Sequence, residues 1–396
     1  MNIGKNRALF ANLLIIGAIV TLVAIYFTPV WWVSLTAPNY PEEAFPDGVR
    51  IHFGMSGVTN GCQKVEKAEI SEGEALDCVH EMDTINHYVG MYPIAAGGVV
   101  EKAFSPFLTG LLIVMLLGFL FSNPKARAGV MALGFGGIVV WMAMTWYGAD
   151  GLKYQSTAYV YALVTSLDQD TSRDEGAADA ESDSGIVARL KASMAKSTGT
   201  AAPDAAAAPP ATPAKGAEKD GYIQHLQVMF EKAQERKPAA ERQTWNGSGS
   251  QVMSWHYGQS LGRYFNNPAE ILPMVRNMSF AAQVVFWGIP LAMLLLLWGA
   301  WKSIRPLYWL LILVPLALPL FFIIEYSGWL WWYGHSLNAM GAFTVKPFMP
   351  TVFGQGKVAQ FTTHSYPYIG FFLMLLSTGM LSLAALLRRK QLQAGE

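Results

Sequence analysis

Charged residues are scarce in this chain of 396 residues. They make up 14% of it, whereas an average soluble domain contains about 25%. Hydrophobic residues make up 52% and aromatic residues 13%. The charges are missing from several long apolar runs rather than thinned out evenly. The composition therefore indicates an integral membrane protein, with a lipid bilayer as its first partner.

Several motifs that would define a function are also absent. The sequence contains no Walker motif, no dinucleotide-binding fingerprint and no Cys-x-x-Cys-His haem-attachment motif. These absences argue against a pump that hydrolyses its own nucleotide. The formal net charge is zero, so nothing points to a nucleic-acid partner.

Six apolar runs are long enough to cross a membrane as helices. We expect spans at about 8–32, 104–121, 129–147, 279–301, 307–324 and 368–387. A further apolar stretch, 158–167, is too short to span. The predicted fold is an all-α transmembrane six-helix bundle, with external loops forming a small mixed cap.

Lys and Arg residues predict the orientation of these spans, because cytoplasmic loops are rich in positive charge. They occur before the first span (Lys5, Arg7), in two short loops (Lys125, Arg127; Lys302, Arg305) and in the tail at 388–390. Six spans place all four groups on one side. We therefore expect a multi-pass protein of a bacterial inner membrane with both termini in the cytoplasm.

This topology divides the chain into membrane and external parts. The spans lie in 1–32, 104–147, 279–324 and 368–396, and the external segments are 33–103, 148–278 and 325–367. The middle external segment contains an acidic stretch followed by an Ala/Pro-rich stretch, near 168–220. Such a composition offers too little apolar surface for a packed core, so a disordered insert is predicted there.

All seven histidines fall in the external segments, and several have methionines close by. His87 and Met91 are spaced as neighbours on one face of a helix. Imidazole and thioether together suit copper, and thioether favours Cu(I). We predict an external copper site formed by His87 and Met91, with His52, His364 and His335 as further ligands. The alternative is that these methionines pack in a core and that the histidines form hydrogen bonds near interfacial aromatic residues.

Both cysteines, Cys62 and Cys78, lie in the first external segment. Their separation suits a disulfide, which an oxidising compartment would permit. Two soft metal ligands are the alternative, and a bridge would remove both thiolates from any copper site.

Four stretches have a familiar pattern: 31–41, 85–91 with the string Asn-His-Tyr-Val-Gly-Met, 347–354 and 361–367. Together they resemble an uncharacterised family of polytopic membrane proteins. Its members accompany genes for copper insertion into nitrous oxide reductase and related copper enzymes. The resemblance implies a context of copper-enzyme maturation rather than a particular activity.

Two functions follow as hypotheses, neither of them enzymatic. The first is a membrane-bound external copper-binding protein that delivers copper to a periplasmic copper enzyme or to its assembly machinery. The second is a non-catalytic subunit that anchors or organises a respiratory or oxidase complex. A secondary transporter fits less well, because the predicted spans hold almost no ionisable residues.

Overall fold

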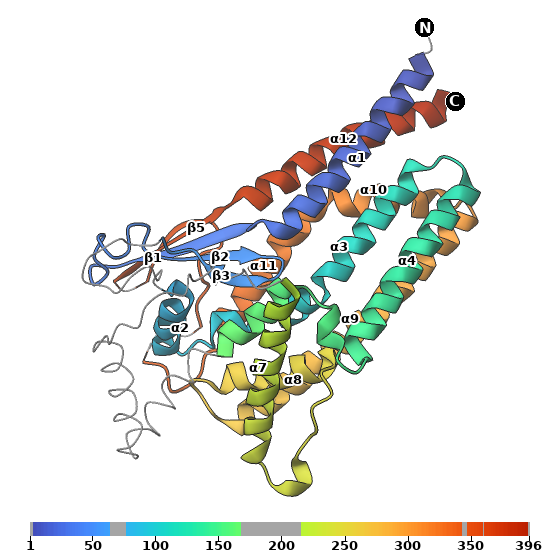
Figure 1. Ribbon diagram of the computed structural model, residues 1–396. Coiled ribbons are helices and arrows are strands. Elements are labelled where there is room, and N and C mark those ends of the chain that lie inside the picture. Colours follow the sequence, from blue (N-terminus) through green and yellow to red (C-terminus); the bar gives the residue numbers. More distant parts are fainter. Residues whose placement is uncertain (1–2, 64–76, 168–214, 343–346, 359, 395–396) are drawn as a thin grey trace, which may run out of the picture. The chain divides into compact units, whose positions relative to one another are not determined.

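The protein is described from a computed structural model that covers residues 3–63, 77–167, 215–342, 347–358 and 360–394. The chain divides into two compact units (Figure 1). One consists of Met1–Ala162 with Asn246–Glu396, and the other of Leu163–Trp245. The first unit contains the candidate membrane helices and every residue predicted to bind copper. The two units are described separately.

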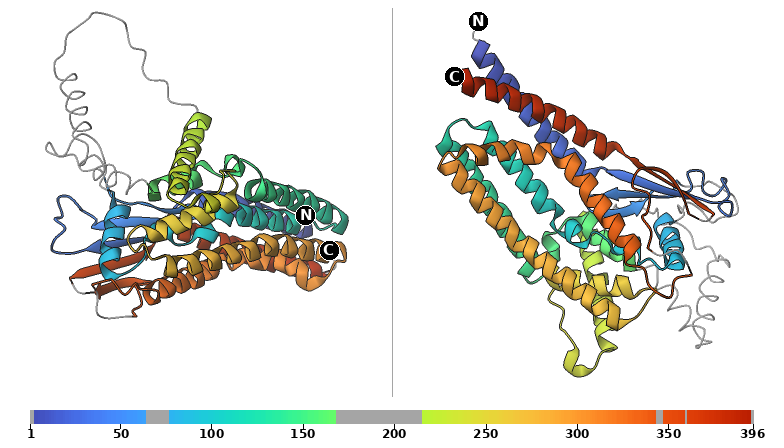
Figure 2. Two further views of the ribbon diagram at one scale, coloured as in Figure 1. Left: turned by 90° about the horizontal axis from the view of Figure 1, so that it is seen from below. Right: turned by 180° about the vertical axis from the view of Figure 1, so that it is seen from behind.

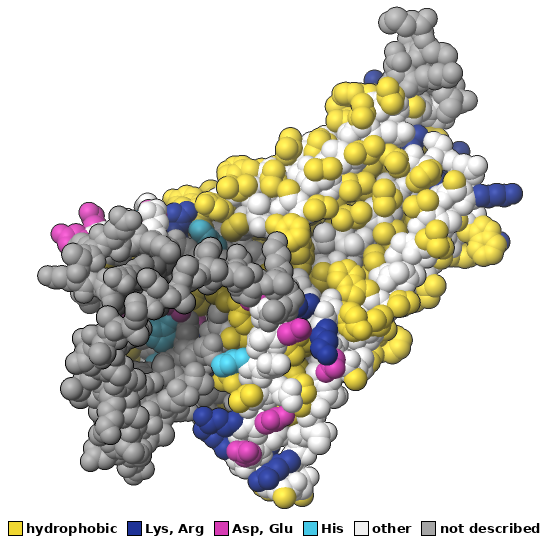
Figure 3. All heavy atoms as spheres, in the orientation of Figure 1, with side chains coloured by type: hydrophobic (Ala, Val, Ile, Leu, Met, Phe, Trp, Pro, Cys, Tyr) yellow, Lys and Arg dark blue, Asp and Glu magenta, His cyan; other side chains and the backbone are white. Residues whose placement is uncertain are grey.

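Within the described residues, five helices are long and apolar enough to cross a membrane. They are α1 (Ile3–Phe27), α3 (Val99–Leu120), α4 (Pro124–Tyr147), α9 (Pro268–Trp301) and α12 (Ile369–Ala394). Hydrophobic side chains cover much of the visible surface of these helices in Figure 3. The prediction of a multi-pass helical membrane protein is confirmed.

The span expected at 307–324 differs from the prediction. It is divided into α10 (Arg305–Leu316) and α11 (Leu318–His335), which meet at an angle of 62°. Pro315 and Pro319 lie on either side of the break. Proline lacks a backbone N–H and its ring clashes with the preceding turn, so the two prolines account for the bend. The pair forms either one broken span or a re-entrant segment, which makes six spans the upper count for the described residues.

The first and last helices pair along their length and continue into neighbouring strands. α1 leads into β1 (Trp31–Thr36), and β5 (Phe361–Pro367) leads into α12. Backbone hydrogen bonds link the junctions, from Tyr368 N to Val30 O (2.9 Å) and from Gly370 N to Pro29 O (2.8 Å). Figures 1 and 2 show the N-terminal end of α1 beside the C-terminal end of α12, away from the sheet.

The cap contains a five-stranded antiparallel sheet in the order β3-β2-β1-β5-β4. Besides β1 and β5 it includes β2 (Val49–Gly54), β3 (Gly57–Asn60) and β4 (Gly354–Val358). The first and third segments that were predicted to be external thus meet in one sheet. A mixed cap was expected, but a sheet of five strands was not. The fold is therefore helical in the candidate spans and α+β outside them.

One face of this sheet forms the core of the cap. Alternate residues Trp31, Val33, Val49 and Ile51 are buried against α2 (Cys78–Val89) and α11. The indole N–H of Trp31 donates to Ser365 Oγ at 2.9 Å, so its polar atom is satisfied inside the core. Successive side chains of a strand point to opposite faces, so the residues between these core residues lie on the opposite face of the sheet.

Three further helices of the first unit lie outside the candidate spans. They are η1 (Ile94–Ala96), η2 (Gly151–Tyr154) and α8 (Gly249–Gly262). The apolar stretch near 158–167 is a short helix, Thr157–Leu167, as its length predicts, and the boundary between the two units falls within it.

The second unit contains α7 (Lys215–Glu235) and η3 (Ala239–Glu241). Arg242 Nη2 donates to Glu235 O at 3.0 Å, and Phe230 packs against Trp245 with ring centroids 5.3 Å apart. Most of the predicted disordered insert, 168–214, lies outside the described residues, whereas residues 215–220 begin α7.

Candidate functional site

The second face of the sheet carries polar and aromatic side chains in transverse rows. Directly opposed residues of antiparallel strands project to the same face, so the strand register defines these rows. The first row is His52, Trp32 and Tyr366, and the second is Arg50, Ser34 and His364. We call this surface the open face. All of these residues except Ser34 are partly exposed.

Arg50 organises the middle of the open face. Its guanidinium carbon lies 4.2 Å from the centre of the Trp32 ring and 5.7 Å from that of Tyr368. Asp47 Oδ2 lies 3.4 Å from Arg50 Nη1 and anchors one end of the group. Ser34 Oγ donates to the backbone oxygen of Asp47, which fixes the loop that holds this carboxylate. The contacts hold a positive charge over an aromatic ring, a cation–π arrangement.

His52 lies beside this arginine, and one of its ring nitrogens has no hydrogen-bond partner among the described residues. This nitrogen is Nε2, which is buried. The His52 ring stacks on Tyr368 with centroids 4.9 Å apart. Burial, followed by the charge of Arg50, lowers the pKa of His52. The imidazole is therefore neutral at neutral pH, the form that binds a metal.

His364 lies on the same face but not next to His52. The strand β1 separates them, and two strand spacings amount to about 10 Å. Trp32 belongs to the row of His52 and Arg50 to the row of His364, and the Arg50 guanidinium lies over the Trp32 ring on the strand between the two histidines. His364 Nε2 is 3.5 Å from Thr36 Oγ1, a long contact at best. A cation held between the two histidines disfavours a shared metal ion.

His87 and Met91 do not share a helical face as expected. Helix α2 ends at Val89, and Gly90 takes the left-handed conformation with φ 97°. The Met91 N–H closes this cap by donating to Asn86 O at 2.8 Å, and the Met91 side chain enters the cap core. The His87 ring stacks between other aromatic rings, 4.6 Å from Tyr264 and 4.7 Å from Phe265. The expected helical pairing is therefore wrong.

The Asn-His-Tyr-Val-Gly-Met string has a structural role here. The loop after α11 bonds to it, from Asn338 N to Gly90 O (2.7 Å) and from Ala342 N to Tyr88 O (2.9 Å). A Cβ added at Gly341 would lie 2.4 Å from Gly90 Cα. Gly90 and Gly341 thus allow the loop and the end of α2 to approach closely.

A buried polar cluster holds the same helix from the other side. Asp83 is fully buried, and its Oδ1 accepts a hydrogen bond from Ile94 N at 2.5 Å. Arg263 Nη1 lies 3.8 Å from Asp83 Oδ2, and Arg263 Nη2 lies 3.3 Å from His80 Nδ1. A buried charge persists only when it is paired in this way, so the cluster fixes α2 relative to α8.

His335 ends α11 on an exposed position. Its Nδ1 lies 2.7 Å from Trp331 O, and its ring stacks on Trp331 with centroids 4.5 Å apart. The five predicted ligands are therefore distributed over the open face, α2, the cap core and the end of α11. In the part of the chain that the structure describes, no group of three His, Cys, Asp or Glu residues could hold a metal ion.

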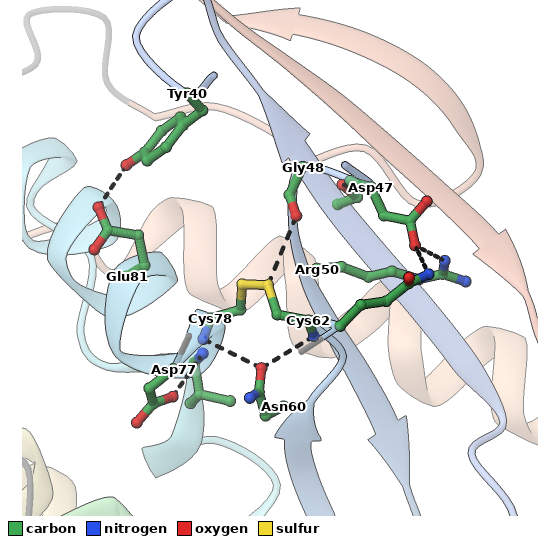
Figure 4. The surroundings of a disulfide bond; sticks show 12 residues. Tyr40, Asp47, Gly48, Arg50, Asn60, Cys62, Asp77, Cys78 and Glu81 are labelled. Carbon is green, nitrogen blue, oxygen red and sulfur yellow. Dashed lines mark hydrogen bonds and ion pairs between the residues drawn. A yellow bond between two sulfur atoms is a disulfide. The ribbon is translucent and has the colours of Figure 1, made fainter. Parts of the chain in front are cut away.

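The two cysteines form a disulfide, the favoured of the two predictions. It joins the end of β3 to the start of α2, with 5.9 Å between the Cα atoms (Figure 4). Asn60 Oδ1 accepts from the backbone N–H groups of Cys62 (3.1 Å) and Cys78 (3.2 Å). Asp77 caps α2 through Val79 N and His80 N. The bridge removes both thiols from any metal site.

Sequence reasoning missed the residues that define the open face, namely Arg50, Trp32, Tyr366 and Tyr368. The available signal was the alternation of apolar and polar residues in 31–36 and 49–54, which is typical of half-buried strands. Comparison with known proteins adds nothing to this site, because no family model, curated protein or solved structure matches the chain.

Proposed function

We propose that the protein is a non-catalytic membrane subunit that binds a partner protein on the open face of its cap. The observation that carries this proposal is the partly exposed group of Trp32, Tyr366 and Arg50 on a rigid sheet. Tyr, Trp and Arg are the residue types that dominate binding energy at protein interfaces. The sheet is backed by a packed core, so little order has to be gained on binding.

The charge of the open face favours an acidic partner. Arg50 in its centre is already paired with Asp47, so the positive charge offered to a partner is mainly that of Lys357, which is exposed in the row that contains Thr36 and Thr362. Complementary charge increases the association rate and selects among partners. The partner surface should therefore combine aromatic residues with Asp or Glu.

Two independent features support an external position of the cap. Lys and Arg flank the helix ends near the chain termini, as in cytoplasmic loops (Figure 3). The disulfide lies in the cap, and disulfides persist in oxidising compartments such as the periplasm. We therefore infer that both termini are cytoplasmic and that the partner binds in the periplasm of a bacterial inner membrane.

Site-specific photo-crosslinking in native membranes tests this function. A benzoylphenylalanine at Gln355, exposed on the open face, should give a discrete adduct with an acidic protein. The same residue at Lys153, also exposed but outside the open face, is the matched control. Lys357→Glu should weaken the Gln355 adduct because it reverses a complementary charge. Equal adducts from both positions, or none from Gln355, would reject the proposal.

Copper handling outside the membrane is the second candidate, favoured by the neutral imidazole of His52 with its unpartnered Nε2. The resemblance to a family associated with copper-enzyme maturation supports it, and the partner would then be a copper enzyme or its assembly machinery. Elemental analysis after copper supplementation tests it, with His52→Ala, His364→Ala and His87→Ala as variants. About one equivalent of copper that is lost in a His variant supports a site. No copper in the wild-type protein would reject copper handling but leave partner binding intact.

A further inference from the structure

A cavity of about 270 Å³ lies where the sheet meets the membrane helices. The end of β2 and the start of β3 form one wall, and α3, α11 and α12 form the others. It is separate from the open face, because Phe53 and Val58, which line it, belong to the alternate set of strand residues. Its volume is near the lower limit of small-molecule sites.

Ionisable groups gather at one end of this cavity. Glu101 and Lys102 come from the first turn of α3, and Glu325 comes from α11. Lys102 Nζ donates one hydrogen bond, to Ala95 O at 2.7 Å. An ammonium group has three donors, so two are left to bind a ligand. Two carboxylates and one ammonium suit a head group that contains both an anion and a cation.

The start of α3 adds backbone donors at the same end. Its N-cap residue is Gly98, which has no side chain to cap the helix. Gly97 and Gly98 both line the cavity. The first N–H groups of a helix attract anions such as phosphate. These donors lie next to Lys102, so one phosphate could contact both.

The other end of the cavity is apolar. Leu108 follows Lys102 by six residues on α3, and Leu318 and Phe321 begin α11 at the break between α10 and α11. Leu108 and Phe321 are 37% and 52% exposed, so this end reaches the outer surface of the helices. An acyl chain could therefore enter from the bilayer.

Trp329 closes the cavity at the cap. A Cβ added at Gly97 would lie 1.7 Å from Trp329 Cζ2, so only glycine allows the indole to approach this closely. A ligand with an apolar tail would enter from the membrane side, with its head group held below Trp329.

We propose that this cavity binds the head group of a phospholipid with a primary amine, phosphatidylethanolamine being the type. The phosphate contacts Lys102 and the start of α3, and the ammonium contacts Glu101 and Glu325. One acyl chain follows Leu108 and Phe321 into the bilayer. A choline head group lacks N–H donors for the carboxylates, and a glycerol head group lacks the positive charge. The proposal is independent of partner binding on the open face.

Native mass spectrometry of delipidated protein tests this site with three lipids of identical acyl chains. The head groups are ethanolamine, choline and glycerol. We expect one tightly bound ethanolamine lipid, with a preference of about tenfold over the choline lipid, a difference of about 1.4 kcal/mol. The double variant Glu101→Gln/Glu325→Gln should remove this preference. Lys102→Gln should weaken all three lipids, whereas Lys153→Gln, an exposed control, should change nothing.

Two further measurements separate the alternatives. Leu108→Trp fills the apolar end, so it should abolish the bound lipid while the protein keeps its fold by circular dichroism. Free phosphoethanolamine should not compete, because it lacks the tail; competition at equal concentration would show a soluble ligand instead and overturn the lipid assignment. Equal binding of the three lipids, or an unchanged preference in the double variant, would overturn the proposal.

Discussion

The two faces of the cap sheet are built from the same strands but differ in what holds their side chains. Trp31 is 2% exposed and contacts the rings of Phe322, Tyr326 and Phe371 from the membrane helices. Its neighbour Trp32 is partly exposed and contacts Arg50 and Tyr366, two residues of the cap. One residue along the strand separates a core position from a surface position.

This difference separates stability from binding in a way that experiments can use. Residues of the core face tie the sheet to α11 and α12, so changes there should act on the fold. Residues of the open face are held mainly by one another, so changes there should act on partner binding. The comparison fails if the two faces respond alike.

Adjacent tryptophans give the largest expected contrast. Trp31→Ala should lower the free energy of unfolding by about 3–5 kcal/mol, because it removes a buried indole and leaves a cavity. Trp32→Ala should cost about 1 kcal/mol, since it removes only partly exposed surface and one cation–π contact. Both unfolding free energies can be measured in detergent by the loss of helical circular dichroism, a signal that does not rely on tryptophan fluorescence.

In the crosslinking assay, which measures partner binding, the two tryptophan variants should rank in the opposite order. Trp32→Ala should abolish the adduct formed from Gln355, while any folded fraction of Trp31→Ala should retain it. If Trp32→Ala destabilises as much as Trp31→Ala, the open face is part of the core and the docking proposal loses its basis.

Removing the disulfide should have the next largest effect. It should lower the free energy of unfolding and leave partner binding unchanged. Cys62 and Cys78 close a loop with a sequence separation of 16, worth on the order of 3 kcal/mol by the loop-entropy model. The double variant Cys62→Ser/Cys78→Ser should lower the unfolding free energy by about that amount, and reductant should mimic it in the wild type. Partner crosslinking should persist below the new unfolding midpoint; its loss in the folded variant would show that the bridge shapes the open face.

The membrane part of the fold was predictable because long apolar runs have few alternatives in a bilayer. The break between α10 and α11 was also visible in principle, as Pro315 and Pro319 stand inside one predicted span. Its angle depends on packing and was not predictable. The sheet was harder, because it pairs residues near 31–60 with residues near 354–367, and a single sequence does not show such distant pairing.

The site was predicted less well than the fold. Spacing placed His87 and Met91 together, but Gly90 ends the helix between them, a signal that favours a C-cap. His52 and His364 do share a face, although β1 lies between them. Residue type identified candidate ligands, whereas their grouping depended on strand register, which no local pattern determines.

The smallest expected effect is a pH dependence at His52. Burial and Arg50 lower the pKa of this imidazole, so the folded protein binds a proton less readily than the unfolded chain does. The unfolded chain binds more protons between the lowered pKa and the ordinary value of about 6.5. The contribution of His52 to stability is therefore complete above about pH 6.5 and is lost as the pH falls through the folded-state pKa. His52→Gln should flatten this part of the stability curve by less than about 1 kcal/mol, because the side chain is only half-buried. Gln355→Ala, a change without a titrating group on the same face, is the matched control and should leave the slope unchanged. An equal effect in both variants would show that the pH response does not come from the His52 imidazole.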